Sequence, residues 1–237
     1  LLSNHHNMEK LGINFKNLDA TCLINLKGDL STETMSYKDL LKESMKVTLA
    51  IEEFDVPKES TISILDRKSS SLVALTLGIL EANFSFCYVK EDDLRLDLID
   101  YNSRFLFSET PTDFKLLKTM RICGKKVFFY QFDIVRNLTN FNDTDNPMLK
   151  ICYAIKTSGT SGTKKTVHVT YSSILPNITS LQRIFQLDHS DVILSMSPIS
   201  FDPFIADLFL ALHSGCALMF IDNSLRFNPI IFDATGV

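Results

Sequence analysis

The sequence predicts an α/β fold in which mixed and parallel sheets are flanked by helices. A strand at residues 61–65, an apolar helix at 70–81 and a strand at 85–89 follow one another. This strand–helix–strand order is typical of a parallel sheet. Short apolar strands and amphipathic helices alternate again from residue 151 to residue 221. Of the 237 residues, 45% are hydrophobic and 22% are charged, which are the proportions of a globular chain that can bury a core.

The first half of the chain contains one clear helix start. Ser36 is a good N-cap, and Asp39, three residues later, can complete the cap. Apolar residues recur at every fourth position and predict the buried face of this helix: Tyr37, Leu41, Met45 and Leu49. Further strands are predicted at 104–107 and 126–132, and the polar stretch 137–147 is predicted to be a connector.

The second half begins with a strand–loop–strand unit. A strand at 151–156 and a short strand at 167–169 flank a loop of Gly, Ser, Thr and Lys residues at 157–165. Two later apolar runs, 192–197 and 216–221, are predicted to be strands.

Two helices are predicted between these strands. The first is expected to begin at Ser172 or Ser173, with Pro176 in its first turn. Its apolar face consists of Ile174, Ile178, Leu181 and Phe185. The second is expected to begin with Asp202 as its cap, followed by a proline at the first helical position, and to stop at Gly215.

The composition argues against several classes of partner and site. The net charge of −4 gives no basic surface for nucleic acid. No uninterrupted apolar run reaches the roughly 18 residues that a membrane span needs. The five cysteines are widely spaced and form no CxxC: Cys22, Cys87, Cys123, Cys152 and Cys216. They are expected to be reduced thiols rather than disulfides or zinc ligands, which predicts no metal site and a cytoplasmic location.

The two ends of the chain are harder to interpret. Segment 1–34 shows no clear pattern, so the main domain is expected to cover 35–237. The chain begins at Leu1 and stops at Val237 without a closing element. We therefore expect a fragment of a longer chain.

The loop 157–165 carries the most chemical information. Its hydroxyl side chains can each donate to a phosphate oxygen: Thr157, Ser158, Thr160, Ser161 and Thr163. Gly159 and Gly162 let backbone N–H groups turn toward one anion, because glycine tolerates positive φ and adds no bulk. Lys164 and Lys165 add positive charge. The loop is therefore predicted to bind a polyphosphate.

The spacing of the glycines excludes two better-known phosphate motifs. The NTPase P-loop needs four residues between its glycines, whereas two separate Gly159 from Gly162. No GxGxxG fingerprint of dinucleotide-binding folds occurs. A flexible polar turn is the alternative interpretation, but the chain has only 8 glycines, and two of them lie in this loop among many donors.

Residues 157–165 resemble the phosphate-loop signature of the adenylate-forming superfamily, which contains acyl-CoA synthetases and the adenylation domains of nonribosomal peptide synthetases. Segments 35–40, 77–83 and 200–203, the last followed by 209–212, are similar to further motifs of this family in the same order. The segments Pro-Asn-Ile at 176–178 and Phe-Asp-Pro at 201–203 are most similar to the animal members that activate β-alanine. Some residues depart from the family pattern: Lys164 replaces Pro, Thr166 and Asn83 replace Gly, and Phe204 replaces Ser.

The resemblance implies the N-terminal portion of a large domain that activates a carboxylic acid with ATP and Mg²⁺. The acid is β-alanine or another small amino acid, and the acyl group passes to coenzyme A or to the phosphopantetheine of a carrier domain on the same chain. Residues 157–165 would hold the β- and γ-phosphates. Asp202 would pair with the substrate amino group. The family's catalytic Lys belongs to a C-terminal domain and would lie beyond Val237, so no catalytic residue is assigned and this portion alone is expected to be inactive.

Three alternatives stay open from the residues. Asp202 can be a simple helix cap, in which case the substrate is a plain fatty or aryl acid. The chain can also be a truncated or non-catalytic module that keeps the adenylation fold and binds nucleotide or a partner without turnover. A phosphate-loop kinase or NTPase is disfavoured by the spacing of the loop.

Overall fold

The computed structural model describes residues 12–13, 17–58, 60–65, 67–133, 147–157 and 165–225. One sheet contains β1 (Thr21–Leu26), β2 (Thr32–Ser36), β10 (Val192–Leu194) and β11 (Ala217–Ile221). The other contains β3 (Thr61–Leu65), β4 (Ser85–Tyr88), β5 (Phe105–Ser108), β6 (Lys115–Ile122), β7 (Lys125–Gln131), β8 (Ile151–Thr157) and β9 (Lys165–Thr170). The helices are α2 (Tyr37–Glu52), α3 (Ser70–Glu81), α4 (Leu94–Asp100), α5 (Tyr171–Phe185) and α6 (Asp202–Ser214). None of these helices is both long and apolar enough to cross a membrane.

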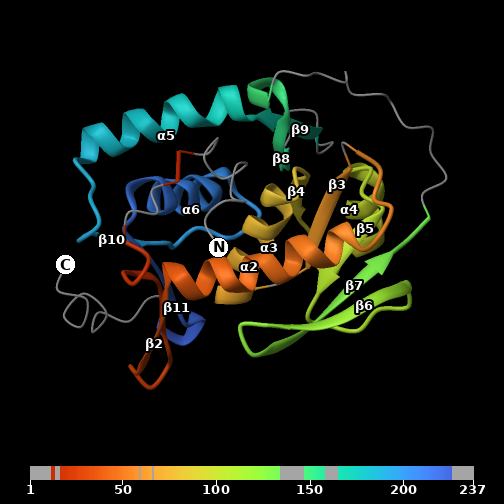
Figure 1. Cartoon of the computed structure of the whole chain (residues 1–237), viewed down its shortest axis with the longest axis horizontal. Helices are drawn as coiled ribbons and strands as arrows, with labels where there is room; N and C mark the ends of the chain where they lie inside the picture. The colour runs from red at the N-terminus through yellow and green to blue at the C-terminus, as the bar shows by residue number, and fades with distance from the viewer. Residues whose placement is uncertain are drawn as a thin grey trace.

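The strand orders confirm the predicted mixed and parallel sheets. The first sheet has the order β10-β11-β1-β2 and the second β6-β7-β5-β3-β4-β8-β9. In the second sheet β3, β4, β5 and β8 are parallel, and antiparallel pairs form at both edges. Figure 1 shows α2 and α3 side by side between the sheets. A buried crossover through α3 joins β3 to β4, as the strand–helix–strand order predicts.

The cap of α2 is confirmed, but its predicted face is partly wrong. The hydroxyl of Ser36 accepts a hydrogen bond from the N–H of Asp39 at 3.1 Å. Leu49 is 54% exposed, because steps of four residues rotate about 40° away from a fixed face of a helix with 3.6 residues per turn. The helix instead buries Tyr37, Leu40, Leu41, Ser44, Val47, Ala50 and Ile51.

The predicted start of α5 is also wrong. The helix begins at Tyr171 with Thr170 as its N-cap, so Pro176 lies inside the helix, in its second turn. The edge strand β9 ends at Thr170 and the helix begins at the next residue, so no loop separates the two elements. Ile178 of the predicted face is fully buried, which helps to hold the helix despite the missing proline N–H, whereas Phe185 is 62% exposed.

Four elements were not predicted: β1, β2, α4 and β6. The strands β2 and β6 lie at the edges of their sheets and expose half or more of their residues, so they lack a clear apolar pattern. The helix α4 has seven residues, too few for a periodic signal. The predicted connector 137–147 lies outside the described residues except for Pro147.

An aromatic cluster joins the large sheet to α6. Phe86 of β4 stacks on Tyr153 of β8 with ring centroids 5.8 Å apart. Tyr88 packs edge-on against Phe204 of α6 at 5.7 Å, and Phe209 of the same helix lies 6.4 Å from Phe86. Such contacts between buried rings fix the position of α6 relative to β4 and β8.

The thiols fit the expectation of reduced cysteines. The structure places Cys22, Cys87, Cys152 and Cys216 in buried positions and leaves Cys123 partly exposed, with no disulfide. Burial raises the pKa of Cys87 to about 12 and that of Cys216 to about 11. Within the described ranges, no group of three or more His, Cys, Asp or Glu side chains is placed to hold a metal ion.

Gly78 should be intolerant of any side chain. A Cβ at this position would lie 2.5 Å from the Ser44 carbonyl oxygen and 2.5 Å from Val47 Cβ, where α3 crosses α2. We expect Gly78→Ala to lower the free energy of unfolding by about 1–3 kcal/mol, measured by urea denaturation. Gly28→Ala is the matched control, because its nearest contact is the Ser224 hydroxyl at 3.0 Å. Equal stability of both variants would contradict the close α2–α3 packing.

The cysteines should differ in reactivity with a disulfide reagent at pH 8. Burial shields four of the thiols from the reagent, and their raised pKa values keep them protonated at pH 8, so we expect only Cys123 to react within minutes in the native protein. All five should react after unfolding. Rapid reaction of a second thiol in the native state would show that the core is more open than described.

Candidate functional site

Tyr153 links the strand β8 to the start of α6. Its ring is buried between Phe86 and Phe209, and its hydroxyl donates a hydrogen bond to Oδ1 of Asp202 at 3.2 Å. Burial, and then the negative charge of Asp202, raise the pKa of Tyr153 well above its usual value. The phenol therefore stays protonated and serves as a permanent donor to this carboxylate.

Asp202 does not cap its helix as the sequence predicted. Phe201 is the N-cap, and the N–H of Phe204 bonds to the Phe201 carbonyl at 3.0 Å. Asp202 is the first helical residue, so its carboxylate lies at the positive end of the helix dipole. The residue is exposed, and one of its carboxylate oxygens is held by Tyr153. The arrangement leaves Oδ2 available to a cation from solvent.

The two ends of the predicted phosphate loop come together in a hairpin. Thr157 is the last residue of β8 and Lys165 the first of β9, and the two are direct partners in the antiparallel register. The Thr157 hydroxyl donates to the Lys165 carbonyl at 3.5 Å, and both residues are exposed. The other predicted phosphate ligands lie outside the described residues: Ser158, Gly159, Thr160, Ser161, Gly162, Thr163 and Lys164.

One strand thus connects both parts of the candidate site. Tyr153 and Thr157 are four residues apart on β8, or about 13 Å at the rise of a β-strand. Asp202 lies near the first of these residues and the loop begins at the second. Ligands of α/β sheets bind outside the carboxyl ends of the strands, which is where β8 delivers Thr157.

Lys68 is a neighbour of this site that sequence reasoning missed. It follows β3, its Nζ donates to the carbonyl of Ser195 at 2.6 Å, and it lies 5.5 Å from the ring centroid of Phe204. A cavity of about 460 Å³ lies beside it, between Arg67 and the loop that leads into α6. The signal in the sequence was the basic pair Arg67-Lys68, which lies two residues after the end of the strand 61–65.

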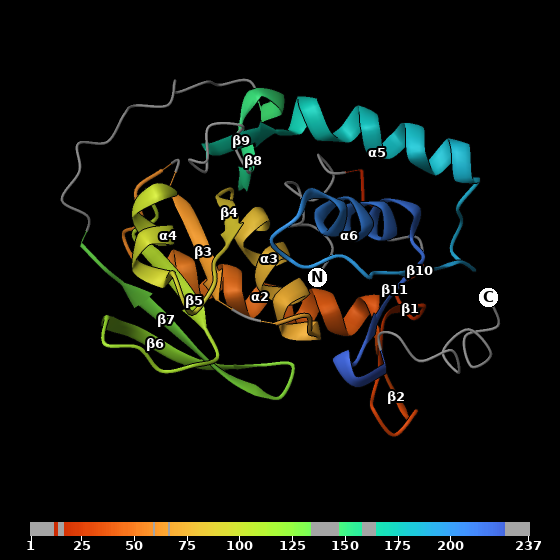
Figure 2. The same cartoon turned by 180° about the vertical axis from the view of Figure 1, so that it is seen from behind.

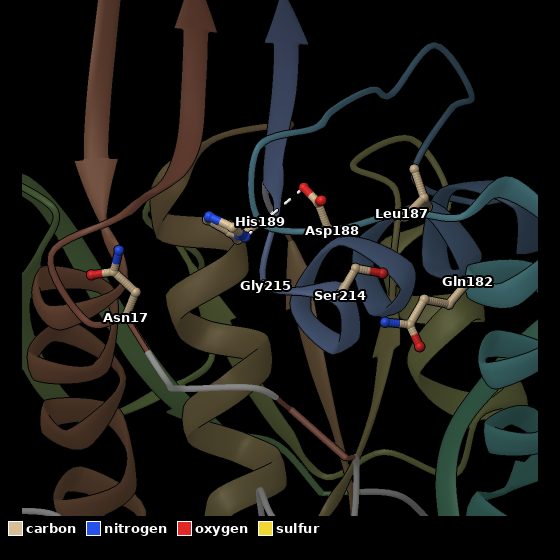
Figure 3. A pocket seen from close by; sticks show the side chains of 7 residues that line it. All are labelled: Asn17, Gln182, Leu187, Asp188, His189, Ser214 and Gly215. Carbon is tan, nitrogen blue, oxygen red and sulfur yellow. Dashed lines mark ion pairs between the residues drawn. The ribbon is translucent and has the colours of Figure 1, made fainter.

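A second cavity, of about 410 Å³, lies at the opposite end of α6 (Figure 3). It is bordered by Asn17, Ser214 and Gly215 and by His189 and Asp188, whose Nδ1 and Oδ1 atoms are 3.9 Å apart. The 13 residues of α6 separate it from Asp202 by about 18 Å. It contains none of the predicted site residues and is separate from the candidate site.

Relatives in sequence agree with the motifs. Part of the beta-alanine-activating enzyme of Drosophila melanogaster is 42% identical to this chain over 79 residues, or 33% of the chain and 8% of that protein. A plipastatin synthase of Bacillus subtilis is 26% identical over 202 residues, or 82% of the chain and 5% of that protein. The matches therefore span less than a tenth of these relatives.

Solved structures share the fold. ATP-bound MatB from Rhodopseudomonas palustris superimposes with a TM-score of 0.71 at 14% identity, covering 98% of this chain and 48% of MatB. The Vibrio cholerae adenylation domain AlmE, in complex with glycyl-adenosine-5'-phosphate, gives a TM-score of 0.69 at 16% identity, covering 98% of this chain and 48% of AlmE. The chain spans about half the length of each.

The family model described as "AMP-binding enzyme" matches residues 14–235, nearly the whole chain. Its match extends over both sheets, the candidate site and the loop between β8 and β9. The resemblance inferred from the motifs is thereby confirmed. The chain belongs to the AMP-binding enzyme family.

Proposed function

We propose that this chain is the N-terminal portion of an adenylation domain that activates a small amino acid. The acid's carboxylate attacks the α-phosphorus of ATP, the bond to the β-phosphate oxygen breaks, and an acyl-adenylate and pyrophosphate form with Mg²⁺ present. The acyl group then passes to a thiol. The hydrogen bond from Tyr153 to Asp202 carries this proposal, because it ties the Asp202 carboxylate, which would bind the substrate amino group, to the strand that leads into the phosphate loop.

The nucleotide end of the site is proposed at residues 157–165. Thr157 and Lys165 face each other at the mouth of the hairpin, where a hydroxyl and an ammonium can contact the same phosphate. Fixed donors at this place stabilise the charge that develops on the leaving pyrophosphate. The ATP-bound state of the similar MatB supports a nucleotide as the ligand.

The acid end is proposed at Asp202. A carboxylate that keeps one oxygen on Tyr153 can offer the other to a substrate ammonium, which is a strong and directional contact. Similarity to the beta-alanine-activating enzyme and to AlmE, which holds a glycyl adenylate, supports a small amino acid over a fatty acid.

The acceptor and location follow from the same proposal. The thiol is that of phosphopantetheine, on a carrier domain of the same protein, or of coenzyme A, and the catalytic Lys belongs to the C-terminal part of the domain. Similarity to plipastatin synthase over 82% of the chain supports a carrier-linked enzyme. A cytoplasmic location is supported by five cysteines without a disulfide.

A module that binds nucleotide without turnover is the second candidate. The observation in its favour is the departure from the family pattern at the end of the loop, where Lys164 replaces Pro and Thr166 replaces Gly. Calorimetry with ATP and pyrophosphate exchange together separate the two, because this candidate binds ATP yet exchanges no pyrophosphate.

Pyrophosphate exchange tests the phosphate loop in the full-length protein. We expect β-alanine-dependent exchange of labelled pyrophosphate into ATP. Lys165→Ala should lower it about a hundredfold, since the loss of one donor to the developing charge costs about 10²–10³ in rate. Gly162→Ala should lower it as well, because a Cβ disfavours the positive φ that lets a backbone N–H turn toward the phosphates. Lys115→Ala, on the exposed edge strand β6, is the control and should keep full exchange.

Two outcomes would overturn the assignment of the loop. Unchanged exchange in both loop variants means that the phosphates bind elsewhere. Nucleotide binding without any exchange by the full-length protein supports the non-catalytic module instead.

Asp202→Asn tests the acid end separately. Loss of the charge should raise KM for β-alanine about tenfold to a hundredfold, because a hydrogen bond to a charged group contributes about 1.5–3 kcal/mol. KM for ATP should stay within twofold. Tyr153→Phe, which loses only the hydroxyl that orients Asp202, should raise KM for β-alanine about fivefold. If propanoate, which lacks the amino group, is affected as strongly as β-alanine, Asp202 does not bind the ammonium.

A further inference from the structure

A nearly buried ion cluster lies directly before the phosphate loop. Lys156, the residue before Thr157, bonds through Nζ to Oδ1 of Asp97 and, at 2.8 Å, to Oδ2 of Asp100. The side chains of Lys156 and Asp97 are only 14% and 9% exposed. The ammonium also lies 5.3 Å from the ring centroid of Tyr101, the residue that ends α4. The strand β8 is thus joined to α4 by a charge contact that is largely shielded from water.

The second arm of the hairpin reaches the same turn of α4. Thr166 of β9 is the direct cross-strand partner of Lys156, and its hydroxyl donates to the carbonyl of Asp100 at 3.2 Å. Asp100 therefore receives Lys156 on its carboxylate and Thr166 on its backbone oxygen. Lys156 directly precedes the loop 157–165 and Thr166 directly follows it, so both arms of the hairpin are held next to the loop. Figures 1 and 2 show α4 close to this hairpin from both sides.

Other contacts restrain this end of the hairpin only weakly. Within the described part of the sheet, β8 pairs with β4 at Phe86↔Tyr153, three residues before Lys156. On its other side β8 pairs with β9, which is the edge strand of the sheet. Among the described residues, α4 therefore supplies the side-chain contacts that hold Lys156 and Thr166.

The charges of this cluster favour a geometric role over a purely stabilising one. Removing an ammonium and a carboxylate from water is costly, and apolar side chains of similar volume often fill such a place with equal stability. Asp97 is itself held, because its Oδ2 accepts from the N–H of Lys90 at 3.1 Å. Burial lowers the pKa of Lys156, but the bonds to Asp100 and Asp97 outweigh it and raise that pKa overall, so the lysine stays charged. A directional contact of this kind specifies one position of β8 on α4.

We propose that Lys156 is a positioning residue which, through Asp97 and Asp100, fixes the hairpin and so presents Thr157 and Lys165 to the phosphates of ATP. The inference rests on the proposed function of this hairpin. Lys156 itself contacts no substrate; its ammonium is occupied by the two carboxylates of α4. Its loss should weaken ATP binding while the acid end, held by Tyr153 and Asp202, is unaffected.

Steady-state kinetics of the full-length protein test the role of Lys156. Lys156→Met should raise KM for ATP about tenfold and leave KM for β-alanine within twofold. Lys156→Arg keeps the charge and can bond both carboxylates, so it should restore KM for ATP to within threefold of wild type. Lys125→Met is the matched control, because it breaks the exposed Lys125–Glu109 pair, 2.8 Å apart, on a distant hairpin; it should change neither KM.

A milder variant and a second measurement keep the test decisive if Lys156→Met fails to fold. Asp100→Asn removes one charge from a carboxylate that is 46% exposed and keeps the carbonyl that Thr166 uses, so the fold should survive; KM for ATP should rise about threefold. Hydrogen exchange measures the order of the hairpin independently of enzymatic activity. The amides of β9 should exchange about tenfold faster in Lys156→Met, while the exchange rates of β3 should not change.

The outcomes separate this inference from the proposed function. If the wild-type protein exchanges pyrophosphate but Lys156→Met leaves both KM for ATP and the β9 amides unchanged, the positioning role is wrong and the function stands. If both values of KM rise equally, Lys156 stabilises the fold only, and the inference fails. If the wild type shows no exchange, the proposed function fails, and with it the step from the hairpin to ATP.

Discussion

The hydrogen bond between Tyr153 and Asp202 is the contact on which the site depends. These residues are 49 positions apart and come from different elements, a strand of the large sheet and the first turn of α6. The bond sets the distance between the Asp202 carboxylate, which suits an ammonium, and the β8–β9 hairpin, which suits a polyphosphate. The donor is a buried phenol with a raised pKa, so the contact persists throughout the neutral pH range.

Aromatic packing keeps that contact in place. Phe204, two residues after Asp202, is fully buried, with Tyr88 on one side and Phe220 on another at 6.2 Å. The family commonly has a serine here, and the phenylalanine turns a small polar position into part of the core. The start of α6 is therefore held by large rings on the side facing the sheets, while Asp202 remains exposed. Rigid support below an exposed charge reduces the reorganisation that substrate binding requires.

Local signals in the sequence were sufficient for much of the fold. The Ser36 cap and the stop at Gly215, which has φ +75°, are short-range features and are confirmed. The role of Asp202 as a cap was wrong because Phe201 occupies the N-cap position and Asp202 is already the first helical residue. Nothing in the order of residues identifies Tyr153 as the partner of Asp202 or Asp97 as that of Lys156, since these pairs arise from the packing of distant elements.

A structure of the full-length protein with β-alanine and a non-hydrolysable ATP analogue tests the central claim most directly. The account predicts that the triphosphate contacts Thr157 and Lys165 and that the amino group of β-alanine lies within hydrogen-bond distance of Asp202. A triphosphate bound away from the β8–β9 hairpin, or an amino group turned away from Asp202 into solvent, would contradict it.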